Sequence, residues 1–278
     1  LGGDTSIDIC LEEAKKAGFS GIELGGKFPR NPGIINYLLN KFQLKMPGGW
    51  YGAQLRNRSI DEEWSAMQDH LNLLKIVKGD IFVFADVSGS IQGDESRSLS
   101  SRPTLEKDEW DDYCNKISEI SNRLFNEGIP MSYHEHMGTI IQSEEDVDRF
   151  IDKTNDKTYL LYDTGHLLFA QANYERILKN YIDRINHIHC KDIRKNILEK
   201  SLNKDLSFRN SFLDGVFTVP GDGCIDYTQL MKILFENKYS DWLVIEAEQD
   251  PAKANPFEYA KIGYNYLSSI LSGIGYEI

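Results

Sequence analysis

The chain has 278 residues, of which 41% are hydrophobic and 27% charged, and its formal net charge is −12. This length and composition suit a single α/β barrel with a sizeable core, and the acidic balance argues against a nucleic-acid partner, which requires a basic face. No apolar run approaches the roughly 18 residues of a membrane span, and no signal peptide is visible, so we expect no membrane association.

In the first half of the chain, hydrophobic spacing predicts alternating helices and strands. We expect helices at about 7–18, 34–41, 61–77 and 107–127, and strands at 21–24, within 42–52 and at 80–86. The run 80–86 is continuously apolar, which is typical of a strand in a parallel sheet. Residues 87–104 are rich in Ser, Gly and Asp and predict a long loop, and long loops inside compact domains are usually functional.

The second half continues the alternation. We expect strands beginning at 131, at 158–163, around 185–192 and at 242–247, with a helix after each of them and a long insertion at 193–218. This makes seven strand-helix units, one fewer than a TIM barrel requires, so we expect the first barrel strand to lie upstream of Leu1. Because no linker or change of composition divides the chain, we predict one domain over residues 1–278.

The four cysteines lie far apart and form no CxxC pair. Dense disulfide frameworks are typical of small secreted domains, so we expect reduced thiols and a cytoplasmic protein. Cys190 lies between two positions that should face inward, which favours a packing role over a nucleophilic one.

Four of the predicted strands end in a residue that can bind a metal: Glu135, Asp163, His189 and Glu246. In barrels of this type the carboxyl ends of the strands converge on one pocket. Three carboxylates and one imidazole make a mostly oxygen site, suited to Mn²⁺, Mg²⁺ or Co²⁺ more than to a structural Zn²⁺. The alternative is that each is an isolated charge paired with a lysine or arginine, which four residues in register make the weaker interpretation.

Strand alternation separates the remaining histidines. His187 shares a face with His189 but lies two residues deeper, as a supporting or a core residue. His134 and His136 flank Glu135 and should point away from its face, although one of them reaches the pocket if the chain turns early at Gly138.

Two further residues are candidates for contact with a substrate. His166 lies in the loop three residues after Asp163. Lys191 follows the inward alternation from His189, where it would stabilise an enolate, serve in proton transfer, or simply pair with Asp163 or Asp192.

These motifs resemble a known family. Segments 133–139 (YHEHMGT), 163–166 (DTGH), 187–192 (HIHCKD), 217–223 and 244–251 are similar to the xylose isomerase-like TIM barrels, and more narrowly to their myo-inosose-2 dehydratase branch in inositol catabolism. Segments 25–29 and 90–94 extend the likeness over nearly the whole chain. The absent first strand departs from the family.

The resemblance implies a metal site of Glu, Asp, His and Glu at successive strand ends, which here are Glu135, Asp163, His189 and Glu246. Many relatives carry His where this chain has Glu135. Glu248 shares a strand face with Glu246, so the choice between these two stays open. The implied activity is a dehydratase that converts 2-keto-myo-inositol (scyllo-inosose) into a trihydroxycyclohexane-1,2-dione and water.

For this reaction a divalent metal would act as a Lewis acid, while a base removes the α-proton and an acid protonates the departing hydroxyl. We assign proton transfer to Glu246 or His166, assisted by Lys191. Expected substrate contacts, each at or just after a strand end, are Lys27, Trp50, Gln92 and His136. The resemblance also allows glutathione as a thiol cofactor and implies a dimer or tetramer.

Three rivals remain. A sugar isomerase or epimerase would use the same metal chemistry without expelling water. An abasic-site endonuclease with three metals would need more histidines and a basic face. In a non-catalytic polyol-binding protein, replacing Glu135 and Asp163 with Ala would alter binding with no turnover to lose, whereas product analysis separates the dehydratase from the isomerase.

Overall fold

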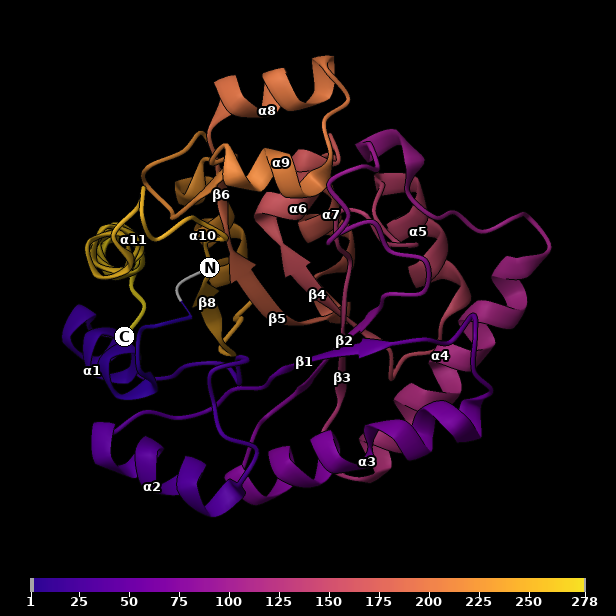
Figure 1. Cartoon of the computed structure of the whole chain (residues 1–278), viewed down its shortest axis with the longest axis horizontal. Helices are drawn as coiled ribbons and strands as arrows, with labels where there is room; N and C mark the ends of the chain where they lie inside the picture. Colours follow the sequence, from indigo (N-terminus) through magenta and orange to yellow (C-terminus); the bar gives the residue numbers. More distant parts are fainter. Residues whose placement is uncertain (1–2, 278) are drawn as a thin grey trace.

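The computed structural model describes residues 3–277 and shows a parallel sheet with helices packed around it (Figure 1). Six strands are hydrogen-bonded in the order β1-β2-β3-β4-β5-β8, every pair parallel. Their bounds are β1 Trp50–Ala53, β2 Phe82–Asp86, β3 Met131–His134, β4 Tyr159–Asp163, β5 Ile185–Cys190 and β8 Leu243–Ile245. Parallel bridges from Gly21 to Lys45 and from Leu24 to Gly49 add the segment 21–24 beside the chain that leads into β1.

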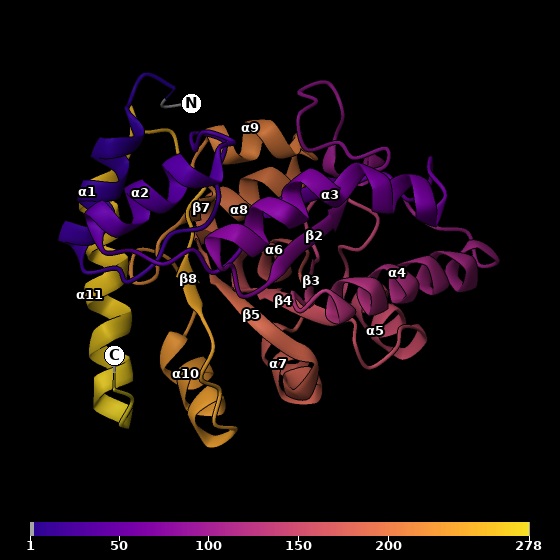
Figure 2. The same cartoon turned by 90° about the horizontal axis from the view of Figure 1, so that it is seen from below.

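The helices pack around the sheet in both views (Figure 2). Those that follow the predicted pattern are α1 Ile7–Ala17, α2 Pro32–Phe42, α3 Ile60–Val77, α4 Glu109–Asn126, α5 Glu144–Lys153, α10 Tyr227–Glu236 and α11 Pro256–Ile274. Their ends carry the expected signals: Ser59 and Glu62 form a capping box at α3, and Gly18 closes α1 with φ 112°. Within residues 3–277, no helix is long and apolar enough to cross a membrane.

One expectation about the second half was wrong. The single helix predicted after the strand at 158–163 is split into α6 Thr164–Phe169 and α7 Tyr174–Tyr181, because Gln171 adopts a positive φ of 60° and Asn173 caps a new helix. The predicted insertion 193–218 is present and consists largely of regular elements. It contains β6 Asp192–Ile193, α8 Lys195–Asn203, α9 Phe208–Leu213 and β7 Phe217–Thr218, with β6 and β7 paired antiparallel.

This ordered insertion has a small core of its own, in which Phe208 and Phe217 pack against Phe169 and Met137. It is also tied to the long loop 87–104, which carries the short 3-10 helix η1 Leu99–Ser101. The Leu99 N–H donates to the Leu206 carbonyl at 2.9 Å, and the Ser100 N–H donates to Asp205 Oδ1 at 2.9 Å. We call this pair of segments, 87–104 and 194–216, the loop clasp.

The sheet is open on one side. Among residues 3–277, no backbone ladder joins β8 to the segment 21–24, and a cavity of about 1070 Å³ lies between them, lined by residues of both. Within residues 3–277, the six strands of the main sheet and the bridged segment 21–24 make up the seven parallel segments that were predicted, and the short strands β6 and β7 are additional. The eighth strand upstream of Leu1 and the single-domain assignment remain predictions.

Candidate active site

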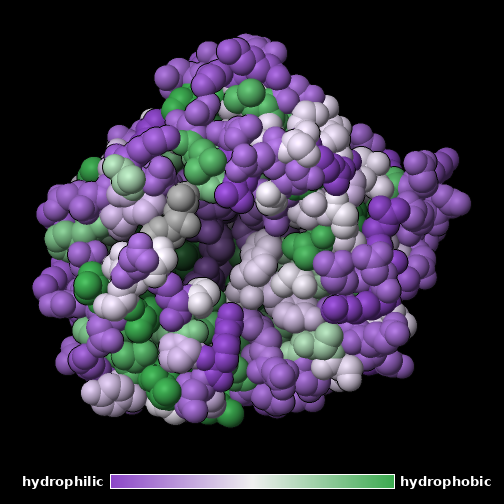
Figure 3. All heavy atoms as spheres, viewed as in Figure 1, coloured by the Kyte–Doolittle hydropathy of each residue, from purple (hydrophilic) through white to green (hydrophobic). Residues whose placement is uncertain are grey.

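The carboxyl ends of β3, β4, β5 and β8 meet beneath a hollow where hydrophilic residues gather on the face shown in Figure 3. A pocket of about 460 Å³ lies there, with Trp50, Gln92, Phe208 and the carboxylate of Glu248 in its wall. The strand ends supply the charged groups, and the loop clasp supplies Gln92 and Phe208. The residues that line the pocket therefore come from segments far apart in the sequence, from Glu23 to Glu248.

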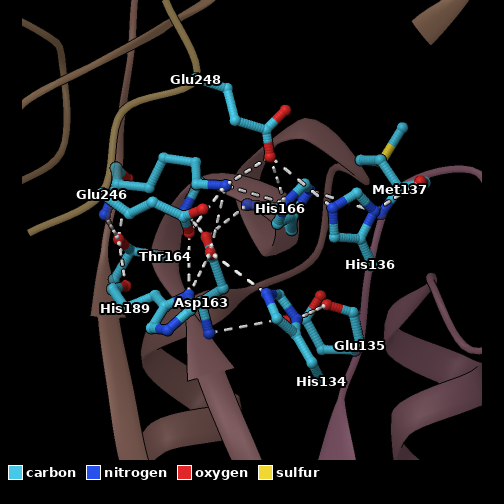
Figure 4. Close-up of polar contacts among 12 residues, drawn as sticks. His134, Glu135, His136, Met137, Asp163, Thr164, His166, His189, Glu246 and Glu248 are labelled. Atoms are coloured by element: carbon cyan, nitrogen blue, oxygen red, sulfur yellow. Dashed lines mark hydrogen bonds and ion pairs between the residues drawn. The ribbon is translucent and has the colours of Figure 1, made fainter. Parts of the chain in front are cut away.

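Four side chains direct ligand atoms to one point below this pocket: His134, Asp163, His189 and Glu246, whose atoms all lie within 4.8 Å of one another (Figure 4). His189 Nδ1 is 2.8 Å from Glu246 Oε2 and 3.6 Å from Asp163 Oδ2. These three atoms are buried and have no hydrogen-bond partner among the described residues. Buried polar atoms without partners are costly, and a divalent cation at their common centre would satisfy all of them.

The other polar atoms of two of these residues are already engaged. Asp163 caps α6 with Oδ1, which accepts from the Gly165 and His166 N–H groups at 2.8 and 2.9 Å, so Oδ2 is left for the centre. His134 donates its Nδ1–H to the Glu135 carbonyl, which leaves the lone pair of Nε2 directed toward Asp163 Oδ2 at 3.8 Å. Each of the two residues therefore directs one defined ligand atom to the centre, as metal sites require.

The geometry corrects the expectation for Glu135. The β3–β4 register pairs His134 with Leu161, and Asp163 lies two residues further along the same face of β4, so His134 points to the centre. Glu135 turns aside, and its Oε1 accepts from the Asp163 N–H at 3.2 Å. Burial and the neighbouring Asp163 raise the pKa of Glu135 well above its ordinary value, which favours the protonated form of this carboxyl.

Lys191 is a buried cation beside the four ligands. Its Nζ is 2.9 Å from Glu248 Oε1, 3.1 Å from Glu246 Oε2 and 3.6 Å from Asp163 Oδ2. Burial alone would lower the pKa of Lys191, but these carboxylates outweigh it and raise the pKa above its usual value. The ammonium therefore stays charged and neutralises part of an acidic cluster.

His136 and His166 lie beside the four candidate ligands and pack against each other, with ring centroids 3.7 Å apart. Together with Glu248 they bring three ligand-capable atoms within 4.8 Å, but the Lys191 ammonium lies 3.0 Å from His166 Nε2 and 2.9 Å from Glu248 Oε1. His136 lines the pocket, whereas His166 is 1% exposed and does not. His166 thus acts through its neighbours, and direct proton transfer from it gains no support from the geometry.

Of the predicted substrate contacts, the structure brings three together. The Trp50 ring lies 5.4 Å from the rings of His134 and His136, and Gln92 Nε2 is 2.6 Å from His136 Nδ1. Lys27 is exposed, lies outside the pocket lining and donates to the Thr5 carbonyl at 2.7 Å. The geometry therefore supports Trp50, Gln92 and His136 as pocket residues, but not Lys27.

The sequence matches the family model of the xylose isomerase-like TIM barrel over residues 11–270. The chain belongs to the xylose isomerase-like TIM barrel family. Its relatives include the rhizopine catabolism protein MocC of Rhizobium meliloti, 37% identical over 100% of this chain and 86% of that protein. The inosose dehydratase of Bacillus velezensis is 38% identical over 98% of this chain and 91% of that enzyme.

Solved structures of other proteins share the fold. The probable 3-DHS dehydratase AsbF of Bacillus anthracis superimposes with a TM-score of 0.73 at 14% identity, covering 95% of this chain and 94% of that one. The IOLI protein, solved with a bound zinc atom, gives a TM-score of 0.72 at 15% identity over 98% and 95% of the two chains. These likenesses confirm the predicted TIM-barrel class.

The sequence analysis did not identify Glu23, which lies in the segment 21–24 next to the proposed ligands. Glu23 Oε1 accepts from His187 Nε2 at 2.8 Å, and its Oε2 lies 3.2 Å from His189 Nε2. Burial acts to raise the pKa of Glu23, but His189 and His187 outweigh it and hold the pKa well below its ordinary value. The available signal was a carboxylate between Ile22 and Leu24 in an otherwise apolar strand.

The metal-free protein should lose stability through His166 as the pH falls. Burial, then His136 and Lys191, lower the pKa of His166 from its usual 6.5 to about 4, against the opposing effect of Asp163 and Glu248. The unfolded state therefore binds more protons between these values, so stability is complete above about pH 6.5 and declines toward about pH 4. Urea titrations in EDTA at several pH values check this, and the His166→Gln variant should show a flatter decline.

Proposed function

We propose that the chain is a metal-dependent inosose dehydratase, a hydro-lyase that converts 2-keto-myo-inositol into 3D-trihydroxycyclohexane-1,2-dione and water. One observation carries the proposal: buried atoms of Asp163, His189 and Glu246, which have no hydrogen-bond partner among the described residues, face one centre at the floor of a polyol-sized pocket. Relatives named inosose dehydratase, 35–38% identical over nearly the whole chain, support the choice of substrate.

We assign the metal to His134, Asp163, His189 and Glu246. Two imidazoles and two carboxylates suit a first-row divalent metal such as Mn²⁺ or Co²⁺, with Zn²⁺ also compatible and Mg²⁺ less so because it prefers oxygen ligands. When bound, the metal supplies Lewis-acid polarisation of the substrate ketone, which acidifies the neighbouring C–H.

Proton transfer falls to groups that line the pocket. The Glu248 carboxylate lines it and is held ionised, because Lys191 and the two nearby histidines outweigh burial and lower its pKa. We assign to Glu248 the removal of the proton next to the ketone. His136, whose Nε2 is 3.7 Å from Glu248 Oε1, is placed to protonate the departing β-hydroxyl. Lys191 and His166 orient these two groups from behind the pocket wall.

The pocket walls suit a six-membered polyol ring. Trp50, Phe208 and Phe212 offer apolar surfaces for the C–H groups of the ring, and Gln92 and His136 offer hydrogen bonds to its hydroxyls. We also propose a cytoplasmic location and a homo-oligomer, dimer or tetramer. The four cysteines are free, in keeping with a reducing compartment, and glutathione stays a candidate thiol cofactor.

The test is incubation of Mn²⁺-loaded protein with 2-keto-myo-inositol, followed by mass spectrometry, beside an EDTA-treated sample and the Asp163→Asn variant. We expect metal-dependent loss of one water in the wild type alone. Conversion of a ketose to an isomer of equal mass would instead establish the isomerase or epimerase. Binding of the polyol without turnover would establish the binding protein.

A further inference from the structure

One carboxylate holds both histidines of β5. His187 and His189 share a face because strand residues alternate, and Glu23 receives an N–H from the Nε2 atom of each. The backbone around Glu23 is fixed on both sides, since the Ile22 N–H donates to the Lys45 carbonyl and the Leu24 N–H to the Gly48 carbonyl, each at 2.9 Å. Glu23 is therefore a rigid acceptor aimed at β5.

This contact decides which nitrogen of His189 can bind a metal. A carboxylate only accepts hydrogen bonds, so the proton of a neutral His189 ring must lie on Nε2, toward Glu23. The lone pair is then on Nδ1, which faces Asp163 Oδ2 and Glu246 Oε2 and has no hydrogen-bond partner within the described part of the chain. The opposite tautomer would place an N–H at the centre and repel a cation.

We propose that Glu23 is a positioning residue for the metal: it fixes His189 as the Nε2–H tautomer with Nδ1 free to ligate, while His187 anchors Glu23 from below. The inference rests on the proposed metal site and adds a residue from the segment 21–24 to it. Carboxylates that accept from the second nitrogen of a metal-bound histidine raise the basicity of the ring and fix its orientation.

Two other roles for Glu23 are distinguishable. Glu23, His187 and His189 also place ligand atoms within 4.8 Å of one another, so the first alternative is that Glu23 binds a second cation itself. However, that arrangement would need the Nε2 protons of both histidines to be absent, and it would leave the unpartnered Nδ1 of His189 unexplained. A purely structural Glu23 would affect folding but not the affinity of the metal.

The test measures metal affinity and tautomer in the Glu23→Gln variant, which preserves the size of the side chain. Because outer carboxylates of this kind contribute about 10–100-fold in metal affinity, we expect the Kd for Mn²⁺ or Zn²⁺, measured by calorimetry, to rise by that factor with one ion still bound per chain. Histidine ¹⁵N spectra of the metal-free protein, taken at a pH above the raised pKa of His189, should show this ring as the Nε2–H tautomer in the wild type and as a mixture in the variant, the signal being assigned with His189→Gln.

The matched control is Glu63→Gln, which removes another buried carboxylate. Glu63 accepts from the Tyr51 hydroxyl and the Gln54 N–H, away from the ligand cluster, so its loss should lower the melting temperature without changing the Kd. Wild-type affinity or an unchanged tautomer in Glu23→Gln would overturn the inference, as would a fall from two bound ions to one. A wild-type protein that binds no divalent metal would overturn the proposed site as well.

Discussion

Replacing His134 with glutamine should abolish metal binding and reduce kcat/KM by about 10³-fold or more. The side chain is buried, its Nδ1–H is committed to the Glu135 carbonyl, and its Nε2 is the one nitrogen that it offers to the centre. A Lewis-acid metal contributes several kcal/mol to such a reaction, and each 1.36 kcal/mol changes the rate about tenfold. Metal content after dialysis and steady-state kinetics measure the two effects.

The control is the variant Glu135→Gln. Glu135 is adjacent to His134 in the sequence, but its side chain turns away from the centre. Burial and Asp163 raise the pKa of Glu135, and its Oε1 accepts from the Asp163 N–H, an interaction that the amide oxygen of glutamine preserves. We therefore expect near wild-type metal content in Glu135→Gln. Loss of metal from this variant, with retention in His134→Gln, would restore the original assignment of Glu135 as the ligand.

Replacing Lys191 with methionine should destabilise the metal-free protein by about 3–5 kcal/mol, the usual cost of leaving buried charges without their partner. Asp163, Glu246 and Glu248 would then face one another without the ammonium that lies 2.9–3.6 Å from their oxygens. Their repulsion raises the pKa values of the folded carboxylates, so the cost is fully present near neutral pH and is relieved as acid protonates them.

Denaturant titrations in EDTA at about pH 7 and about pH 5 measure this loss and its pH dependence. Addition of Mn²⁺ should recover part of the stability, because a divalent cation replaces the missing positive charge. The control is Lys16→Met, which breaks an exposed pair with Glu12 and should cost only about 0.5 kcal/mol. A Lys191→Met protein as stable as this control would show that the ammonium does not neutralise the cluster.

Sequence periodicity was sufficient to locate three of the four candidate ligands. Asp163, His189 and Glu246 each lie at or next to the end of an apolar strand, and the ends of parallel strands must converge. It failed at β3, which has only four residues before the chain turns. A strand this short does not fix its own face, and the register with β4 was needed to choose His134 over Glu135.

Glu23 and the helices α8 and α9 were missed for a different reason. The contact of Glu23 with His189 joins positions 166 residues apart, and no local pattern predicts it. Helices α8 and α9 have nine and six residues, too short to be stable alone, and depend on packing among Phe208, Phe217 and their neighbours. Tertiary contacts, rather than propensity, define both features.

The loop clasp carries residues proposed to contact the substrate, and these can change separately from the residues that bind the metal. The proposed metal ligands lie at the ends of barrel strands, whereas Gln92 and Phe208 lie on segments that support each other through the contacts Leu99–Leu206 and Ser100–Asp205. A related enzyme that acts on a different ring substrate would need changes in both segments together, since either segment alone loses the contacts that support it. Substrate preference should therefore evolve in paired steps, while the chemistry beneath it stays unchanged.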